Sequence, residues 1–273
     1  MSLMVSSLNS GSNGNCYYIG NDTEAVLIDV GISSRETERR LKRQELSIRK
    51  VKGIFITHEH ADHVGGLRKL AKRHHLPVYM TYETRRVSRL ELREIQVRNF
   101  VPHEEIPIGR LRVIPFPVMH DAQDPHGFIV TDGSVTVGVF TDLGVVSHHH
   151  PAYFKRCDAV FLESNYDETM LENGDYPREL KDRISGTRGH LSNLQALEFF
   201  MTARPDHMSH LFLSHLSENN NTPEIVQQLF SAVAGKTSVV IASRYKESGV
   251  YRIGGEKSGP VLQSTASEQL SLF

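Results

Sequence analysis

Four side chains of metal-ligand type lie within six residues of this chain, at His58, His60, Asp62 and His63. Residues two apart in an extended segment point to the same side, so His58 and His60 can reach one ion together. Asp62 and His63 fall where the chain turns into an expected helix, and they can face a second ion nearby. Imidazole and carboxylate suit Zn, Mn or Fe, and the absence of a thiolate argues against a closed structural zinc site. The cluster therefore predicts a site that keeps a position open for water.

Such a site would carry out hydrolysis. Two cations held about 3.5–4 Å apart lower the pKa of a bridging water enough to supply hydroxide near neutral pH. They also withdraw charge from the atom under attack. Because this chemistry suits phosphodiesters, thioesters and lactams alike, the cluster predicts the type of reaction and leaves the substrate open.

The elements that must position these side chains are strands that end in loops. A short apolar run over 53–57 predicts a buried strand directly before the cluster, and 64–75 is expected to be helical. Three further ligand-type residues each follow an expected strand: His120 after 113–119, Asp142 after 135–140 and His215 after 211–214. Loops at the carboxyl ends of strands build sites in α/β folds, which favours bringing all three to the cluster.

The rest of the chain predicts one α/β domain over 1–273. Hairpin strands over 4–8, 16–19 and 25–30 come first, and later strands alternate with helices over 33–46, 191–203 and 223–234. This order favours two mixed sheets packed together with helices outside. Residues 1–3 are expected to be a leader ahead of Met4, and 254–273 a weakly ordered tail.

Composition limits the possible partners and the location. The 273 residues carry a net charge of -1, so contact with nucleic acid would need a local basic patch. Two cysteines cannot form a disulfide framework, which favours a reduced, cytoplasmic setting. No apolar run approaches the roughly 18 residues of a membrane span, so no membrane contact is expected.

In their order and element types, these residues resemble the metallo-β-lactamase-fold hydrolases. The resemblance implies a four-layer αβ/βα sandwich and two divalent metal ions per chain. It also implies ligands for the first ion (His58, His60, His120), for the second (Asp62, His63, His215) and for both (Asp142). Asp29 matches an early aspartate of the family that orients a ligand, although an ordinary strand-end turn is the alternative.

Five segments together resemble the YycJ-type subgroup, single-domain bacterial proteins associated with 5′-to-3′ exonuclease activity on DNA and with metal-dependent phosphodiester cleavage. They are Ser10–Asn15, Thr57–His63, His120–Ala122, Glu163–Asn165 and Gly189–Asn193. The chain departs from the subgroup at Tyr166, where a histidine is expected. We therefore predict a DNA nuclease that uses a metal-bridged hydroxide. A small-molecule phosphodiesterase, lactonase or thioesterase of the same fold is the alternative, and a non-catalytic scaffold is a third.

His190 opens an expected helix and is the predicted catalytic residue together with Asp62. Beside a metal pair, it can donate a proton to a leaving alkoxide or bind a phosphate oxygen, and a solvent-facing helix cap is the alternative. The predicted substrate-binding residues are Ser12, Asn13, Asn15, Ser192 and Asn193.

The loop over 10–15 can cradle a phosphate with backbone amides, or it can be a flexible hairpin turn. Four basic residues lead into the His190 segment, and they are either phosphate contacts or ordinary solvated surface. They are Arg178, Lys181, Arg183 and Arg188.

Overall fold

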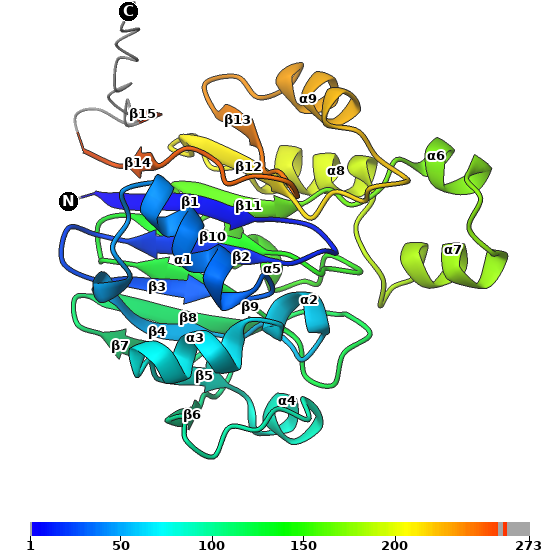
Figure 1. The fold of residues 1–273 in the computed structure, drawn as a ribbon. Helices are drawn as coiled ribbons and strands as arrows, with labels where there is room; N and C mark the ends of the chain where they lie inside the picture. The colour runs from blue at the N-terminus through cyan, green and yellow to red at the C-terminus, as the bar shows by residue number, and fades with distance from the viewer. Residues whose placement is uncertain (1, 256–258, 261–273) are drawn as a thin grey trace, which may run out of the picture.

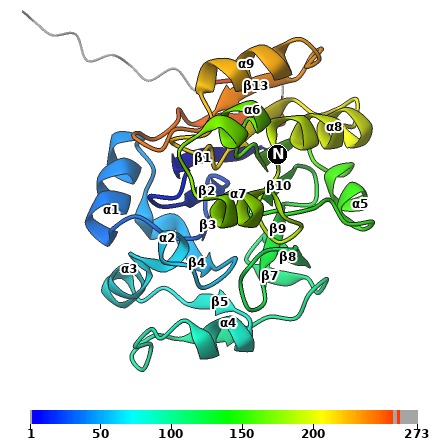
Figure 2. The same cartoon turned by 90° about the vertical axis from the view of Figure 1, so that its right-hand side faces the viewer.

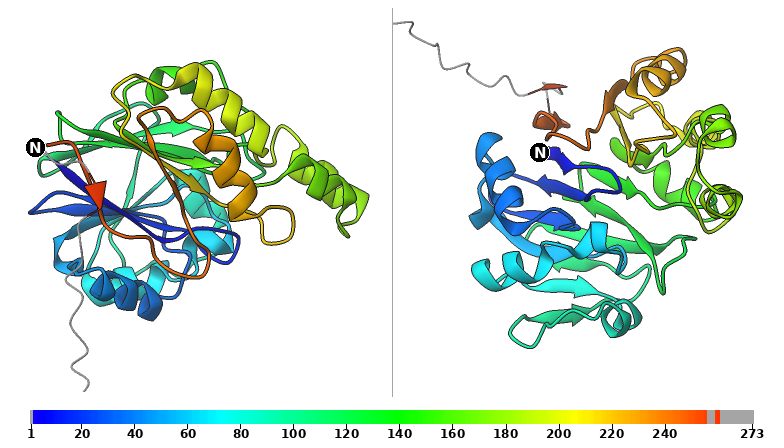
Figure 3. Two further views of the ribbon diagram at one scale, coloured as in Figure 1. Left: turned by 90° about the horizontal axis from the view of Figure 1, so that it is seen from above. Right: turned by 45° about the vertical axis from the view of Figure 1, so that its right-hand side comes forward.

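Two β-sheets pack face to face in the computed structural model, which describes residues 2–255 and 259–260, and helices cover the outer face of each sheet (Figure 1, Figure 3). The first sheet has the strand order β15-β14-β1-β2-β3-β4-β5-β6. Its strands are Leu3–Asn9 (β1), Cys16–Gly20 (β2), Ala25–Ile28 (β3), Val51–Phe55 (β4), Val78–Met80 (β5), Val97–Asn99 (β6), Tyr251–Ile253 (β14) and Gly259–Pro260 (β15). Strands β3 to β6 run parallel, and β1 pairs antiparallel with β2 and β14.

The second sheet has the order β13-β12-β11-β10-β9-β8-β7. Its strands are Ile106–Ile108 (β7), Leu111–Pro117 (β8), His126–Thr131 (β9), Thr136–Phe140 (β10), Ala159–Glu163 (β11), His210–Ser214 (β12) and Ser238–Ile241 (β13). Strands β10 to β13 are parallel, so their carboxyl ends meet at one edge of the sheet. Antiparallel hairpins β7–β8 and β8–β9 complete it.

The helices form the two outer layers and one protruding pair. They are Ser34–Arg43 (α1), Ala61–Val64 (α2), Leu67–His74 (α3), Tyr82–Val87 (α4), His150–Phe154 (α5), Glu168–Asn173 (α6), Arg178–Ser185 (α7), Asn193–Ala203 (α8) and Pro223–Ser231 (α9), with a 3-10 turn at Ile48–Lys50. Apolar side chains of α1 and α3 join the outer face of the first sheet, and those of α5, α8 and α9 join the second. Helices α6 and α7 project beyond the sheets (Figure 1).

Alternation along the strands explains this layering. In β2, Tyr17 and Ile19 enter the core between the sheets, while Cys16 and Tyr18 pack under the helices of the first sheet. Both faces of a strand in such a sandwich are buried, so the strands are almost continuously apolar. The prediction of two mixed sheets with helices outside is confirmed.

Both ends of the described chain contribute strands to the first sheet. Leu3, placed in a leader by the sequence, lies in β1 opposite Ile253 and is fully buried, and the expectation of a leader over 1–3 stays a prediction. Within the predicted tail, 259–260 pair with β14, and 256–258 and 261–273 lie outside the described residues. Short elements such as α4, α6 and α7 were not predicted, because they bury few apolar side chains and leave a weak periodic pattern. No helix in the described part of the chain has the length and apolar character needed to cross a bilayer.

Candidate metal centre

The predicted ligands come together at the carboxyl ends of strands from both sheets. Asp29 follows β3 and His58 comes shortly after β4 in the first sheet, while Asp142 and His215 follow β10 and β12 in the second. Figure 2 looks at this end of the molecule, where α6 and α7 stand in front of the sheets. Side chains separated by long stretches of sequence therefore share one site.

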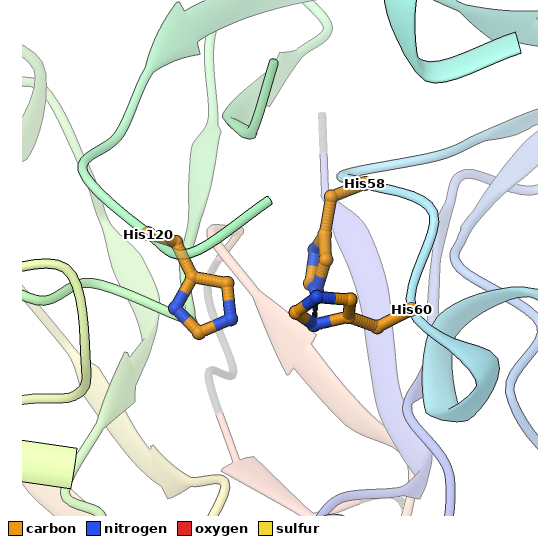
Figure 4. Close-up of side chains that lie close together, drawn as sticks. All are labelled: His58, His60 and His120. Atoms are coloured by element: carbon orange, nitrogen blue, oxygen red, sulfur yellow. Dashed lines mark hydrogen bonds between the residues drawn. The ribbon is translucent and has the colours of Figure 1, made fainter. Parts of the chain in front are cut away.

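His58, His60 and His120 form the first group of candidate ligands, and their rings converge on a common space (Figure 4). The Nε2 of His58 lies 3.0 Å from the Nδ1 of His60. Each residue offers one nitrogen, and these three nitrogens lie within 4.8 Å of one another. This geometry suits a single cation.

Asp62, His63 and His215 form the second group. The Oδ2 of Asp62 lies 3.4 Å from the Nε2 of His63 and 3.7 Å from the Nε2 of His215. Asp142 stands between the groups, with Oδ2 3.4 Å from the Nε2 of His63 and Oδ1 3.7 Å from the Nε2 of His120. Its two oxygens thus face both groups of histidines.

Hydrogen bonds fix which ring nitrogens remain available. The Nδ1 of His63 donates to Asp29 Oδ2 at 2.7 Å, and the Nδ1 of His120 donates to the carbonyl of Gly189 at 2.9 Å. The Nδ1 of His215 donates to Glu163 Oε1 at 2.9 Å. Because these acceptors hold the proton on Nδ1, the atom of each ring that can lose its proton and bind a metal ion is Nε2, which faces the site.

Asp29 supports a further ligand through Thr57. The hydroxyl of Thr57 donates to Asp29 Oδ2 at 2.8 Å and accepts from the Nδ1 of His58 at 3.0 Å. Asp29 therefore orients His63 directly and His58 indirectly, which is the supporting position the resemblance implies for it.

Unsatisfied atoms indicate that the donor set is suited to cations. Buried Asp142 Oδ2, His215 Nε2 and Asp121 Oδ1 have no hydrogen-bond partner within the residues described. Leaving buried polar atoms unpaired costs about 1–3 kcal/mol each, and a bound cation would satisfy them. Imidazole nitrogens and carboxylate oxygens in this number fit divalent metals.

Charge around the second group supports the same conclusion. Burial alone would lower the pKa of His215, but the carboxylates of Asp142, Asp62 and Glu163 raise it to about 10. The pKa of His63 is likewise raised against its burial by Asp142, Asp62 and Asp29. Such a negative potential attracts positive charge, whether a proton or a metal ion.

The first group lies in a different electrostatic environment. Burial, together with neighbouring histidines, holds the pKa of His58 well below its usual value. Burial also lowers the pKa of His120. Both rings are therefore neutral, which is the form that binds a metal ion.

Three of the site residues have a left-handed backbone, although none is glycine. Asp29, Asp142 and His215 have φ of 59°, 55° and 57°. Each follows a parallel strand, where the reversal turns the side chain back toward the centre. Strained residues of this kind are uncommon outside glycine and cluster at functional sites.

His190 lies at the edge of the centre and is held by Glu163. Its Nδ1 donates to Glu163 Oε1 at 2.7 Å, so its Nε2 is the ring atom left to exchange a proton with a substrate. The ring centroid is 5.0 Å from that of His120 and 5.1 Å from that of His215. The side chain is 19% exposed, more than neighbouring His120 and His215, which are 3% exposed each.

The glycine-rich loop between β1 and β2 reaches the centre through Asn15. Its side-chain Nδ2 lies 3.1 Å from His63 Nε2 and 3.4 Å from Asp62 Oδ2. The backbone amides of residues 10, 11, 14 and 15 donate within the protein. A cradle formed by all the amides of the loop, as the sequence suggested, is therefore not available. Ser12 and Asn13 are exposed, in contrast to buried Asn15.

Ser192 and Asn193 lie at the start of α8. Both are 1% exposed. Ser192 caps α8 in a capping box with Gln195, and Asn193 bonds to Ser164 and Asn221. Their polar side-chain atoms already bond to fix the start of α8, and the assignment of these two residues to substrate contact stays a prediction.

The basic residues before His190 also have protein partners. Arg183 pairs with Asp121, and Arg188 donates to the carbonyls of His120 and Ala122. Arg178 pairs with Glu172 and Asp182, and Lys181 donates to the carbonyl of Glu172. Arg183 and Arg188 thus hold the segment that carries His120.

Two site residues were not singled out from the sequence. Glu163, the last residue of β11, accepts from both His190 and His215 and from the amides of Leu143 and Leu191. Asp121 places Oδ1 3.1 Å from His120 Nε2. A signal existed for each, because one ends a buried parallel strand and the other directly follows a predicted ligand.

Gly31 allows the loop after β3 to approach the cluster. A Cβ at this position would lie 1.7 Å from the carbonyl oxygen of Asp62. We expect Gly31→Ala to displace Asp62 and His63 and to lower metal content, measured by plasma mass spectrometry on purified protein. Gly249→Ala is the control, since its Cβ would have no neighbour nearer than 3.6 Å. Equal metal content in the two variants would contradict this prediction.

A family model described as the beta-lactamase superfamily domain matches residues 24–215 of this chain, which include every predicted ligand. The chain belongs to the metallo-β-lactamase superfamily. It is a hydrolytic enzyme of this superfamily, whose members bind divalent metals. The prediction of the family is confirmed.

Relatives whose names state an activity align with most of the chain. It is 36% identical over 236 residues to "Exodeoxyribonuclease YycJ" of Bacillus anthracis, covering 85% of this chain and 89% of that protein. It is 29% identical to "Exodeoxyribonuclease WalJ" of Streptococcus pneumoniae, covering 84% and 88%. The metallo-β-lactamase fold protein YhfI from Bacillus subtilis superposes with a TM-score of 0.71 at 17% identity, covering 92% of this chain and 100% of YhfI, which supports the fold alone.

Proposed function

We propose that this protein is a metal-dependent nuclease that cleaves phosphodiester bonds at DNA ends, in the manner of a 5′-to-3′ exonuclease. The observation that carries the proposal is the position of His190, a partly exposed histidine held by Glu163 beside the candidate ligands. The full-length similarity to relatives named as exodeoxyribonucleases supports DNA as the substrate.

The proposal assigns two divalent ions to the centre, with Zn, Mn and Fe as the candidates. His58, His60 and His120 would hold one ion; Asp62, His63 and His215 the other; Asp142 both. Bound there, the ions would supply a water acidic enough to attack near neutral pH and would withdraw charge from the phosphate. Asp62, partly exposed on the open side, would also contact this water.

The chain's own residues supply the remaining steps. His190 Nε2 would donate a proton to the alkoxide that leaves, because Nδ1 is engaged by Glu163. The Glu163 carboxylate would stabilise the protonated ring before the transfer. Glu163 also accepts from the buried amides of Leu143 and Leu191, and these bonds fix the orientation of the carboxylate and therefore of the ring. Asn15 would hold Asp62 in place from the glycine-rich loop.

A small-molecule phosphodiesterase, lactonase or thioesterase remains the alternative within the same fold. The net charge of -1 gives no broad basic surface, which leaves a small substrate possible. The nuclease hypothesis predicts that DNA is cleaved from its end, and the small-molecule hypothesis predicts that it is not.

The test is cleavage of 5′-labelled and 3′-labelled single- and double-stranded DNA in Mn²⁺ or Zn²⁺. We expect mononucleotide release from the 5′ end that EDTA abolishes and added metal restores. Turnover of bis-p-nitrophenyl phosphate without any cleavage of DNA would favour the alternative. Absence of metal-dependent turnover on both substrates would reject the proposal.

A further inference from the structure

A hollow lies beside the glycine-rich loop and close to the metal centre. It has a volume of about 300 Å³ and lies between the segment after His215 and the segment after β13. Its lining includes Ser10, Leu216, Glu218, Arg244, Tyr245 and Lys246. This volume is at the lower end of the range that holds small ligands.

The hollow and the metal centre share two structural connections. Ser10 lines the hollow, and its hydroxyl accepts from the backbone amide of His215 at 2.8 Å. The loop that carries Asn15 to His63 also places Asn13 against Arg244, whose carbonyl accepts from Asn13 Nδ2 at 2.8 Å. A chain bound at the centre would therefore reach the hollow within a short distance.

Arg244 provides unused hydrogen-bonding capacity in this hollow. Its side chain is 11% exposed, and its buried Nε and Nη1 have no partner among the described residues. Among the residues that the structure describes, Nη2 alone makes polar contacts, at 3.3 Å from Glu218 Oε2 and 3.5 Å from Ser12 Oγ, and the guanidinium carbon lies 6.0 Å from the centre of the Tyr245 ring. A buried guanidinium with two unpaired nitrogens is suited to binding a phosphate through more than one hydrogen bond.

Tyr245 provides an exposed aromatic surface beside this cation. The ring is 70% exposed, although large apolar groups usually avoid water, and its hydroxyl donates to Glu218 at 3.0 Å. Exposed Lys246 follows it. An aromatic ring between two basic side chains is the combination that binds single-stranded nucleic acid, because the ring stacks on a base and the cations contact the backbone.

We propose that this hollow binds a nucleotide of single-stranded DNA adjacent to the bond being cleaved, with Tyr245 stacked on the base and Arg244 on a phosphate. The proposal rests on the nuclease function proposed above. Glu218 opposes the phosphate, because it shares Arg244 when the hollow is empty. Removing its charge should therefore strengthen binding, a gain that misfolding cannot imitate.

Binding is measured first without cleavage, by fluorescence anisotropy of a labelled octathymidylate with EDTA-treated full-length protein. We expect Tyr245→Ala and Arg244→Gln to raise the Kd about 10-fold, in line with the loss of one stacked base or one phosphate contact. Tyr245→Phe, which keeps the ring, should stay near wild type. Glu218→Gln should lower the Kd, and Glu172→Gln, on exposed α6, is its matched control.

Cleavage is measured next, as the ratio of kcat/KM on DNA to kcat/KM on bis-p-nitrophenyl phosphate, which is too small to span both sites. We expect Tyr245→Ala and Arg244→Gln to lower this ratio through a higher KM for DNA. If wild-type protein cleaves DNA but all four hollow variants keep its Kd and its ratio, the hollow is not a nucleotide site. If the wild-type protein neither binds nor cleaves DNA, the nuclease proposal itself fails.

Discussion

Replacing His190 by alanine should lower kcat on DNA by about 10²- to 10⁴-fold, the usual contribution of a positioned acid or base. Metal content should stay at the wild-type value, because Glu163 keeps its bonds to His215 and to the amides of Leu143 and Leu191 when the ring of His190 is removed. His207→Ala, at an exposed position, is the control. Steady-state rates and plasma mass spectrometry on the same preparations give both quantities.

The choice of substrate separates the two roles that His190 can have. A p-nitrophenolate leaves without a proton, whereas the alkoxide released from DNA requires one. If His190 is the general acid, its loss should be much larger on DNA than on bis-p-nitrophenyl phosphate. Equal losses would identify a phosphate-binding residue, and full activity on DNA would show that His190 has neither role.

Replacing Asp142 by asparagine should abolish activity and release metal. The carboxylate faces the histidines of both groups, so its loss should exceed the about 10- to 100-fold cost of removing a group that merely supports a ligand. Asparagine preserves the shape and tolerates the left-handed backbone at φ 55°. The fold should therefore survive, which thermal unfolding of the EDTA-treated proteins can check.

Asp206→Asn is the control for this prediction, because Asp206 is exposed and precedes β12, whereas the ligand His215 follows the opposite end of that strand. Wild-type activity together with two retained ions in Asp142→Asn would exclude a bridging role for Asp142. Retention of one ion with lost activity would place Asp142 mainly on the ion that departs.

The ligands that lie close together in the sequence could be predicted, because residue spacing within one segment sets the directions of their side chains. His58 and His60 are two residues apart after a buried strand, and that spacing alone directs both toward one ion. Asp142 and His215 could be added because parallel strands of one sheet end at a common edge, which the structure places at β10 and β12. The layered fold could be predicted from the order of the elements, hairpin strands first and then strands that alternate with helices.

What could not be predicted depends on contacts between distant segments. Glu163 gains its role from His190 and His215, which lie 27 and 52 residues away in sequence. Ser192 looked accessible in a polar motif, but the packing of α8 buries it and uses its hydroxyl as a cap. Leu3 could not be assigned to the core from the sequence, because its burial depends on its pairing with Ile253 in β14, 250 positions later in the chain.

The candidate ligands are divided between the two halves of the sandwich: His58, His60 and His63 follow a strand of one sheet, and Asp142 and His215 follow strands of the other. Cations bound there would be coordinated by residues of both sheets, so neither half alone would carry the complete set of ligands. A free metal concentration of about 100 times the dissociation constant would add about 2.7 kcal/mol per site to the free energy of unfolding. The melting temperature of this enzyme would then report the free metal concentration around it.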